Sequence, residues 1–378
     1  MSAAIWGDFN IYRDMKNFLI QMLFNLRWVL LPLGLIHWGV IRLRNFLYDQ
    51  NLFTSRSLSR PVISVGNIQM GGTGKTPLVI ELIKALQQVG LQVGVLTRGY
   101  KRGAKDIRIV NLAHTGEQED LPGAIGDEAT LLLQHLSDGV LGVGGSRYEV
   151  GNKLLKTHPI DVFLLDDGFQ HRQLRRDMDI CLIDVSRWRR HPFLFPFSYL
   201  RDCRSSLRRA DVIILTRFEQ SARQLQAVEH FLATHFTGPA WKAQLMVTHL
   251  TRLDDAREIP PHRVKGRAVA AICGIGNPWH FYRMVKALGA NLVWRQSFGD
   301  HHRFTAEEIR AAVQNARAAG AEWLLLTEKD AVKLEMLKKE LGELVEKIRV
   351  VKIEFRLTEM PVLLEKILEI ARRNEERN

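Results

Sequence analysis

The chain has 378 residues, of which 46% are hydrophobic, 25% charged and 8% aromatic; this length and composition allow two globular domains and exclude collagen-like, coiled-coil and disordered classes. The formal net charge is +12. A surface of this charge is expected to attract an anionic partner, which leaves nucleic acid, phosphorylated metabolites and an acidic membrane leaflet as candidates.

The first sixty residues contain one long apolar segment, residues 17–41, whose only charge is Arg27. A helix of this length could cross a hydrocarbon core of ~30 Å. The central charge, the break at Pro32 and polar residues spaced along one helix face favour a helix that lies in the membrane interface; a spanning helix and a buried core helix are the alternatives. Residues 1–58 are therefore predicted to form a membrane-associated helical segment. No signal peptide is predicted, because the start of the chain lacks a basic region.

From residue 61 onward, short β-branched runs alternate with helical stretches, which is typical of βαβ units around a parallel sheet. The expected fold is α/β, a P-loop NTPase-type, mostly parallel sheet flanked by helices, with a second, smaller α/β lobe. We expect a first domain at 59–237, an irregular polar connection at 238–265 and the second lobe at 266–378. The expected strands are 62–65, 92–97, 162–166, 180–184, 212–216, 268–273, 323–327 and 350–355, and helices are expected near 277–288 and 306–319, the latter with a capping box.

A glycine-rich loop follows the first of these strands. Residues 66–77 read GNIQMGGTGKTP and lead into a helical stretch, which is the strand–loop–helix context of a Walker A phosphate site. Lys75 is expected to reach the β- and γ-phosphates of ATP, and the Thr76 hydroxyl to bind Mg²⁺. The sequence departs from the usual motif at Gln69, where the first glycine normally stands, and at Met70, where partitioning-type ATPases carry a lysine. The residues predicted to bind the nucleotide are Gln69, Met70, Gly71, Gly72, Thr73, Gly74, Lys75 and Thr76.

Another apolar run, residues 160–167, ends in two carboxylates, Asp166 and Asp167. The carboxyl ends of parallel strands meet at one edge of a sheet, so these side chains are expected beside the glycine-rich loop. An acidic pair at that place is typical of a Walker B element, which holds Mg²⁺ directly or through water.

Several motifs, taken in chain order, resemble those of the tetraacyldisaccharide 4'-kinase family over roughly residues 62–332. They are GNIQMGGTGKTP at 66–77, LTRGY at 96–100, GDE at 126–128, DDGFQH at 166–171, GIG at 274–276, DH at 300–301 and TEKDA at 327–331. The resemblance implies a P-loop kinase domain at 59–237 that uses ATP and Mg²⁺. The implied reaction moves the γ-phosphoryl group to the 4'-hydroxyl of a tetraacylated glucosamine disaccharide 1-phosphate, forming lipid IVA in lipid A biosynthesis. Residues 195–202 depart from the family's usual segment.

The same resemblance implies where the protein works and what it binds. The expected location is the cytoplasmic face of the bacterial inner membrane, with a peripheral or N-terminally anchored attachment. The expected partners are the lipid substrate and the membrane surface, with neither nucleic acid nor an obligate protein partner. Two other functions remain open: a membrane-associated partitioning-type ATPase switch, which would dimerise with nucleotide, and an ATPase stimulated by nucleic acid.

By resemblance, Asp127 is the base that accepts the hydroxyl proton and His301 pairs with it across the cleft between the lobes, while Lys75 supplies charge. From the residues alone, helix capping by Asp127 is the stronger interpretation, because it opens an apolar helical run. Glu128 joins Asp166 and Asp167 as a candidate metal group, and Asp167 is expected to be a closer metal contact than Asp166. His302 is the alternative to His301, and no zinc site is expected from two adjacent histidines.

Basic side chains supply the remaining candidates. Arg98 and Arg147 are expected to bind phosphates of ATP or of the acceptor, with solvated surface roles as the alternative. Gln170 and His171 complete the candidate substrate residues. Arginines and aromatic residues between 187 and 209 are predicted to form a membrane-facing rim, although a nucleic-acid-binding surface would look similar.

Overall fold

The computed structural model describes residues 31–376, apart from 101, 103–105, 112–119, 138, 190–192 and 196. Its strands form one 13-stranded sheet in the order β11-β10-β12-β13-β8-β7-β6-β1-β5-β2-β4-β3, with β9 paired to β8. The strands are β1 (Val62–Asn67), β2 (Val93–Thr97), β3 (Arg108–Val110), β4 (Val140–Val143), β5 (Val162–Asp166), β6 (Met178–Asp184), β7 (Val212–Thr216), β8 (Ala240–Arg252), β9 (Glu258–Ile259), β10 (Ala268–Cys273), β11 (Asn291–Ser297), β12 (Trp323–Thr327) and β13 (Ile348–Leu357).

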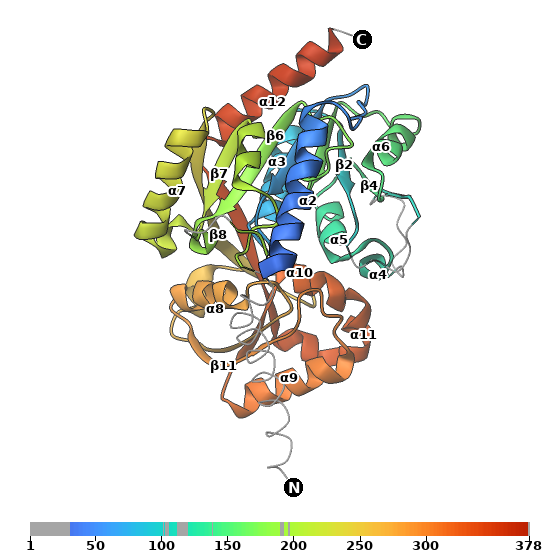
Figure 1. Cartoon of the computed structure of the whole chain (residues 1–378). Helices are drawn as coiled ribbons and strands as arrows, with labels where there is room; N and C mark the ends of the chain where they lie inside the picture. The colour runs from blue at the N-terminus through green and yellow to red at the C-terminus, as the bar shows by residue number, and fades with distance from the viewer. Residues whose placement is uncertain are drawn as a thin grey trace.

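The helices lie on both faces of this sheet. They are α2 (Leu31–Asp49), α3 (Lys75–Gln88), α4 (Leu121–Ile125), α5 (Asp127–Leu133), α6 (Arg147–Leu155), α7 (Ala222–His235), α8 (Pro278–Ala287), α9 (Ala306–Ala318), α10 (Glu328–Ala331), α11 (Lys338–Leu341) and α12 (Met360–Glu375). In the first lobe, α3, α5 and α12 pack on one face, and α2, α6 and α7 pack on the other (Figure 1). The expected α/β architecture, a mostly parallel sheet flanked by helices with a second lobe, is confirmed.

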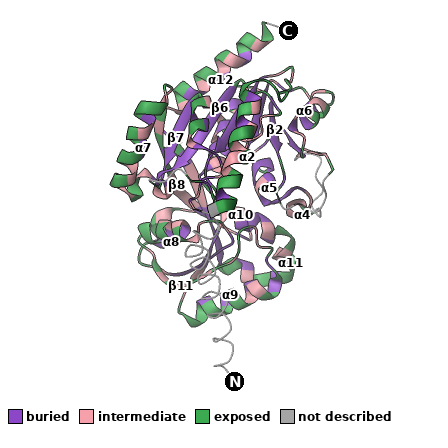
Figure 2. Cartoon of the chain, viewed as in Figure 1, coloured by how far each residue is buried: buried purple, intermediate pink, exposed green. Residues whose placement is uncertain are grey.

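The central strands form because their aliphatic runs are buried on both faces, as a parallel sheet between two helical layers requires. Every residue of β1, β2, β5, β6 and β7 is buried, and Figure 2 shows the interior of the first lobe as buried between exposed outer helix faces. The boundaries expected for β5, β7, β10 and β12 agree with the structure. The capping box that starts α9 is also present, with Thr305 and Glu308 bonded reciprocally.

The expected irregular connection at 238–265 is wrong in its local structure, because its first half is the 13-residue strand β8. Exposed residues alternate with buried or partly buried ones along the first half of β8, so polar residues interrupt the apolar signal in the sequence. β8 pairs in parallel with β7 and antiparallel with β13, and it therefore joins the two lobes into one sheet.

The pairing of β8 with β7 and β13 determines which way the strands of each lobe point, and hence where a ligand is expected to bind. β8 runs in the direction of the first-lobe strands, whereas β10, β12 and β13 run against it. The carboxyl ends of the strands in both lobes therefore face the junction between the lobes. In open α/β sheets this edge carries the ligand site, and α10 lies at the same junction in Figure 1.

The predicted membrane-associated segment lies in part outside the described residues, which begin at residue 31. The described part includes α2, which packs Trp38 and Ile41 on the first lobe. Within residues 31–376, as far as they are described, no helix is both long and apolar enough to cross a membrane.

Candidate active site

The glycine-rich loop connects β1 to α3 at the junction of the lobes. Gly71 and Gly74 have φ values of 89° and 99°, a left-handed conformation that glycine adopts without strain. The Asn67 amide nitrogen donates to Thr73 Oγ1 at 2.8 Å and so holds the loop from within. Lys75 is the first residue of α3, where backbone N–H groups and the helix dipole favour a phosphate group.

Gln69 was predicted to bind the nucleotide, but its side chain anchors the glycine-rich loop to the protein. Its side chain is buried, donates to the Asp184 carbonyl at 3.0 Å and accepts from the Asp184 N–H at 2.7 Å. These two bonds tie the loop to the end of β6, so the Gln69 side chain does not face the phosphate position. Met70 is exposed, and its carbonyl accepts from Arg187 Nη1 at 2.6 Å.

The carboxylates at the end of β5 have opposite environments. Asp166 is fully buried, and its burial together with the charges of Glu128 and Asp167 raises the pKa of its carboxyl to about 7. Burial also favours the neutral form of Asp167, but the charges of Lys75 and Arg201 outweigh it and hold the Asp167 pKa well below its usual range. Lys75 Nζ lies 3.3 Å from Asp167 Oδ1, and Arg201 Nη1 lies 3.0 Å from Oδ2.

The candidate magnesium ligands Thr76, Asp166, Asp167 and Glu128 do not form a preassembled cage. No three His, Cys, Asp or Glu side chains in the described part of the chain converge on one metal position. Asp167, expected to be the closer metal contact, is instead paired with Lys75 and Arg201, whereas Asp166 Oδ1 is buried with no hydrogen-bond partner in the structure. An orphaned carboxylate oxygen beside a phosphate loop fits Mg²⁺, which commonly takes one or two carboxylates and completes its shell with phosphate and water.

Asp127 and His301 meet across the junction of the lobes. Asp127 is the first residue of α5 and is 6% exposed. His301 follows β11 in the second lobe, has a φ of 62°, and places Nδ1 2.8 Å and 3.0 Å from the two Asp127 oxygens. The other expected candidate, His302, contacts Glu308 instead, at 2.9 Å. The structure therefore pairs Asp127 with His301 and not with His302.

Lys329 is a site residue that sequence reasoning missed. From α10 its Nζ lies 2.9 Å from Glu128 Oε1, 3.3 Å from Asp300 Oδ1 and 3.8 Å from Asp127 Oδ2. Burial raises the pKa of Asp127, but the hydrogen bond from His301 and the charge of Lys329 outweigh it and leave that pKa below its usual value. The signal in the sequence was the TEKDA motif, which contains Lys329 but indicates no target for its side chain.

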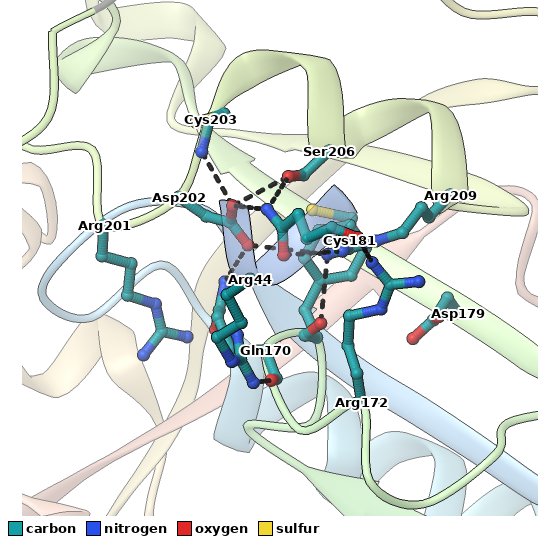
Figure 3. Close-up of polar contacts among 12 residues, drawn as sticks. Arg44, Gln170, Arg172, Asp179, Cys181, Arg201, Asp202, Cys203, Ser206 and Arg209 are labelled. Carbon is teal, nitrogen blue, oxygen red and sulfur yellow. Dashed lines mark hydrogen bonds and ion pairs between the residues drawn. The ribbon is translucent and has the colours of Figure 1, made fainter. Parts of the chain in front are cut away.

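The candidate acceptor-binding residues divide into two groups: Arg147 and His171, whose pKa values are lowered by burial, and Gln170, which bonds to the protein backbone. Arg147 is buried, and burial together with the charge of Arg98 lowers the pKa of its guanidinium to about 10. His171 is partly buried, and burial together with the charge of Arg147 lowers its pKa to about 3, so its ring is neutral at pH 7. Gln170 is engaged elsewhere: its side chain donates to the Asn67 carbonyl at 2.8 Å, and Figure 3 shows it beside Arg44 and Asp202.

The predicted membrane-facing arginine rim is wrong for several of its members. Arg201 binds Asp167, and Arg187 binds the glycine-rich loop. Arg209 points inward, where it donates to the Phe169 carbonyl at 3.3 Å and lies 3.5 Å from Asp202 (Figure 3). Arg190 lies outside the described residues. The apolar members of the rim also divide, because Phe193 and Phe195 are exposed whereas Trp188 and Leu194 are buried.

Comparisons with known proteins agree over nearly the whole chain. A family model described as tetraacyldisaccharide-1-P 4'-kinase matches residues 26–372. A tetraacyldisaccharide 4'-kinase from Anaeromyxobacter sp. (strain K) is 35% identical over 332 residues, which cover 87% of this chain and 86% of the relative. One from Syntrophus aciditrophicus is 35% identical over 312 residues, covering 80% and 82%. A crystal structure of apo-form LpxK from Aquifex aeolicus in complex with ATP is 32% identical, with a TM-score of 0.70 over 91% of this chain and 99% of that chain.

Proposed function

The chain belongs to the tetraacyldisaccharide-1-P 4'-kinase family, and we propose how its own residues carry out the family's reaction. The activity is the ATP-dependent phosphorylation of a tetraacyldisaccharide at its 4' position in lipid A biosynthesis, with Mg²⁺ as cofactor. In this proposal residues 59–237 hold the nucleotide, and the second lobe completes the site with His301 and Lys329. Of the residues 266–378 predicted for that lobe, the last helix, α12, packs on the first lobe instead. The observation that carries the proposal is the contact between Asp127 and His301 across the two lobes.

Asp127 is the proton acceptor for the 4'-hydroxyl. A base for phosphoryl transfer must be ionised at the working pH and held in one orientation. The lowered pKa of Asp127 supports the first condition, and two contacts to His301 Nδ1 support the second. Asp127 is also near the phosphate loop, because its neighbour Glu128 lies close enough to Asp166 to raise the pKa of that carboxyl. His301 is the positioning residue of this pair.

Lys75 is the cation that stabilises charge on the γ-phosphoryl group. Its present partner Asp167 also binds Arg201, so an arriving phosphate can attract Lys75 while Asp167 stays paired with Arg201. Arg187 bridges the Met70 carbonyl and, at 3.5 Å, the Gly276 carbonyl of the second lobe, which supports a role in holding the loop against that lobe. When Mg²⁺ is bound, it would neutralise phosphate charge next to Asp166 and Thr76.

The acceptor is proposed to approach past Arg147, Arg98 and His171. Arg147 is a buried cation whose Nε has no hydrogen-bond partner in the structure. A planar guanidinium with free donors suits a phosphate group, and the family's acceptor carries one. The neutral ring of His171 can accept a hydroxyl proton in a hydrogen bond. Gln170 keeps a structural role in this scheme.

The proposed membrane contact lies on α2. Its inner face, spaced by three or four residues, packs on the first lobe and includes Gly34, Trp38, Ile41, Asn45 and Tyr48. Its outer face is exposed and mostly apolar. The exposed apolar residues are Leu33, Leu35, Ile36, Val40, Leu43 and Phe46, and His37 and Arg42 are exposed among them. An apolar helix face of this kind supports attachment to the membrane surface, and we propose the cytoplasmic side of the inner membrane, where ATP is available.

Transfer of label from radiolabelled ATP to tetraacyldisaccharide 1-phosphate tests this function directly. The purified full chain with Mg²⁺ and detergent should produce a labelled lipid, and Lys75→Ala should reduce the labelled product by about a hundredfold or more. Absence of labelled lipid from a folded, ATP-binding chain would contradict the proposal. Nucleotide-dependent dimerisation without any acceptor would instead indicate the switch function.

A further inference from the structure

An arginine-lined pocket lies in the second lobe, away from the site at the junction. Its volume is about 260 Å³, and Arg252, Arg257, Arg263 and Arg349 line it together with Glu258 and Pro260. The pocket forms where the start of β13 pairs with the end of β8, since Arg349 is opposite Arg252 in the register. The antiparallel hairpin of β8 and β9 and the 3-10 turn η6 (Pro261–Val264) supply the rest of the wall.

Four arginines and one carboxylate, Glu258, line the pocket, and Asp254 and Asp255 lie beside Arg252. Arg252 is paired, because its guanidinium contacts Asp254 and lies 3.5 Å from Asp255. Glu258 faces His249 at 3.8 Å. No carboxylate among the described residues lies within 4 Å of the Arg257 or Arg263 guanidinium. Two exposed arginines therefore line this pocket without an acidic partner.

Arg349 also lines the pocket and has a buried donor without a hydrogen-bond partner. Arg349 is 8% exposed, and its Nη1 donates to the Glu346 carbonyl at 2.6 Å and the Ile348 carbonyl at 3.0 Å. Its Nε is buried with no hydrogen-bond partner in the structure. The guanidinium also lies 5.0 Å from the Trp323 ring, which fixes its plane. A buried donor without an acceptor is costly unless a ligand or water satisfies it.

The pocket is separate from the phosphate loop. Arg349 is near the start of β13. Phe355, six residues further along the same strand, lies next to the phosphate loop, because a Cβ placed on Gly74 would be 3.5 Å from its ring. A strand rises ~3.3 Å per residue, so the two places are roughly 20 Å apart. A nucleotide bound at the loop therefore cannot also fill this pocket.

We propose that this pocket is a second anion site, which binds a small ligand carrying a phosphate or pyrophosphate group. Arginine donors in a fork geometry match phosphate oxygens, and an anion would neutralise Arg257 and Arg263 and lie beside the largely buried Arg349 guanidinium. The volume lies just below the ~300 Å³ at which drug-sized pockets begin, so a small phosphate ester fits better than a large cofactor. Such a group can come from a free metabolite or from a lipid headgroup.

Calorimetric titration with inorganic pyrophosphate tests the site on the full chain carrying Lys75→Ala, which weakens binding at the phosphate loop. Pyrophosphate should still bind to this chain. Adding Arg257→Gln and Arg263→Gln should lower the remaining affinity by about tenfold or more. The matched control adds Arg223→Gln to the Lys75→Ala chain. Arg223 is an exposed arginine on α7, outside the pocket, so its replacement should leave the affinity for pyrophosphate unchanged. Equal thermal midpoints show that the variants are folded.

A second arm distinguishes the two sources of the phosphate group. Vesicles of phosphatidylcholine with and without phosphatidic acid are sedimented with the same three chains. Loss of phosphatidic acid-dependent binding only in the Arg257→Gln, Arg263→Gln chain supports the site with a lipid headgroup as its ligand. If the pocket substitutions weaken pyrophosphate binding but leave sedimentation with the vesicles unchanged, the result supports the site with a free metabolite as its ligand. The proposal is overturned if the pocket variant and the Arg223→Gln control bind both probes alike, or if the Lys75→Ala chain binds neither.

Discussion

His301 Nδ1 lies 2.8 Å from Asp127 Oδ1, although 174 positions in the sequence separate the two residues and they belong to different lobes. The His301 backbone is left-handed, and its N–H donates to the Gly274 carbonyl at 3.2 Å. The loop after β11 is thereby held against the end of β10. Asp127 is thus oriented by a residue that the second lobe brings to it.

Replacing His301 by glutamine should lower kcat by about tenfold or more while the KM for ATP stays nearly constant. Without the hydrogen bond from His301 the ionised form of Asp127 loses support, so the acid limb of the kcat profile should move to higher pH. The matched control is His302→Gln, because His302 contacts Glu308 instead of Asp127. Equal effects of the two substitutions would contradict the assignment.

Replacing Lys329 by methionine should raise the pKa of Asp127, because it removes a positive charge from the vicinity of that carboxylate. The acid limb of the kcat profile should therefore move to higher pH, which kcat measured from pH 4 to pH 8 checks. Lys329→Arg keeps the charge and should restore most of the wild-type profile. A uniform loss at all pH values in both variants would indicate a purely structural role.

Replacing Asp166 by asparagine should stabilise the metal-free chain at high pH. The folded-state pKa of about 7 lies above the unfolded value of 3.8, so the ionised carboxylate destabilises the fold as pH rises from about 4 through 7. Asparagine avoids this charge. The free energy of unfolding should be higher for Asp166→Asn than for wild type by a few kcal/mol at pH 8.5, with little difference at pH 4. A pH-independent difference would rule out this origin of the effect.

Replacing Gly66 by alanine should destabilise the fold near the phosphate loop. A Cβ at this position would lie 2.5 Å from the Phe169 Cβ and 2.6 Å from the Phe169 backbone nitrogen, and the Phe169 ring is buried. Overpacking of this kind costs about 1–3 kcal/mol, which denaturant unfolding can measure. The control is Gly39→Ala on α2, where nothing lies within 4 Å and alanine favours the helix. Equal stability of the two variants would show that Phe169 gives way freely.

The sequence predicts the parts of the fold that have local periodicity. The buried runs β5, β7, β10 and β12 agree with their expected boundaries, because both faces of each strand are covered and the apolar signal is continuous. β8 was missed because its side chains alternate between solvent and core. A strand of this kind resembles a polar connection unless its pairing with β13 is known.

Side-chain contacts between distant segments could not be predicted from residue patterns. Gln69 occupies a glycine position of the Walker motif, and only its two bonds with Asp184 explain why a longer side chain is accommodated there. Arg201 was interpreted as part of a membrane rim, since its pairing with Asp167 spans 34 residues. The pairing of Asp127 with His301 was expected through family resemblance alone, because helix capping explains Asp127 equally well locally.

The Asp127→Asn variant gives the most direct test of the proposed site. Transfer of radiolabelled phosphate to tetraacyldisaccharide 1-phosphate and ATP affinity should be measured on the same preparation of this variant. If Asp127 accepts the hydroxyl proton, transfer falls by about a hundredfold or more while the dissociation constant for ATP changes little. Undiminished transfer, or a loss of ATP affinity that accounts for the slower transfer, would contradict the role of Asp127 as the base.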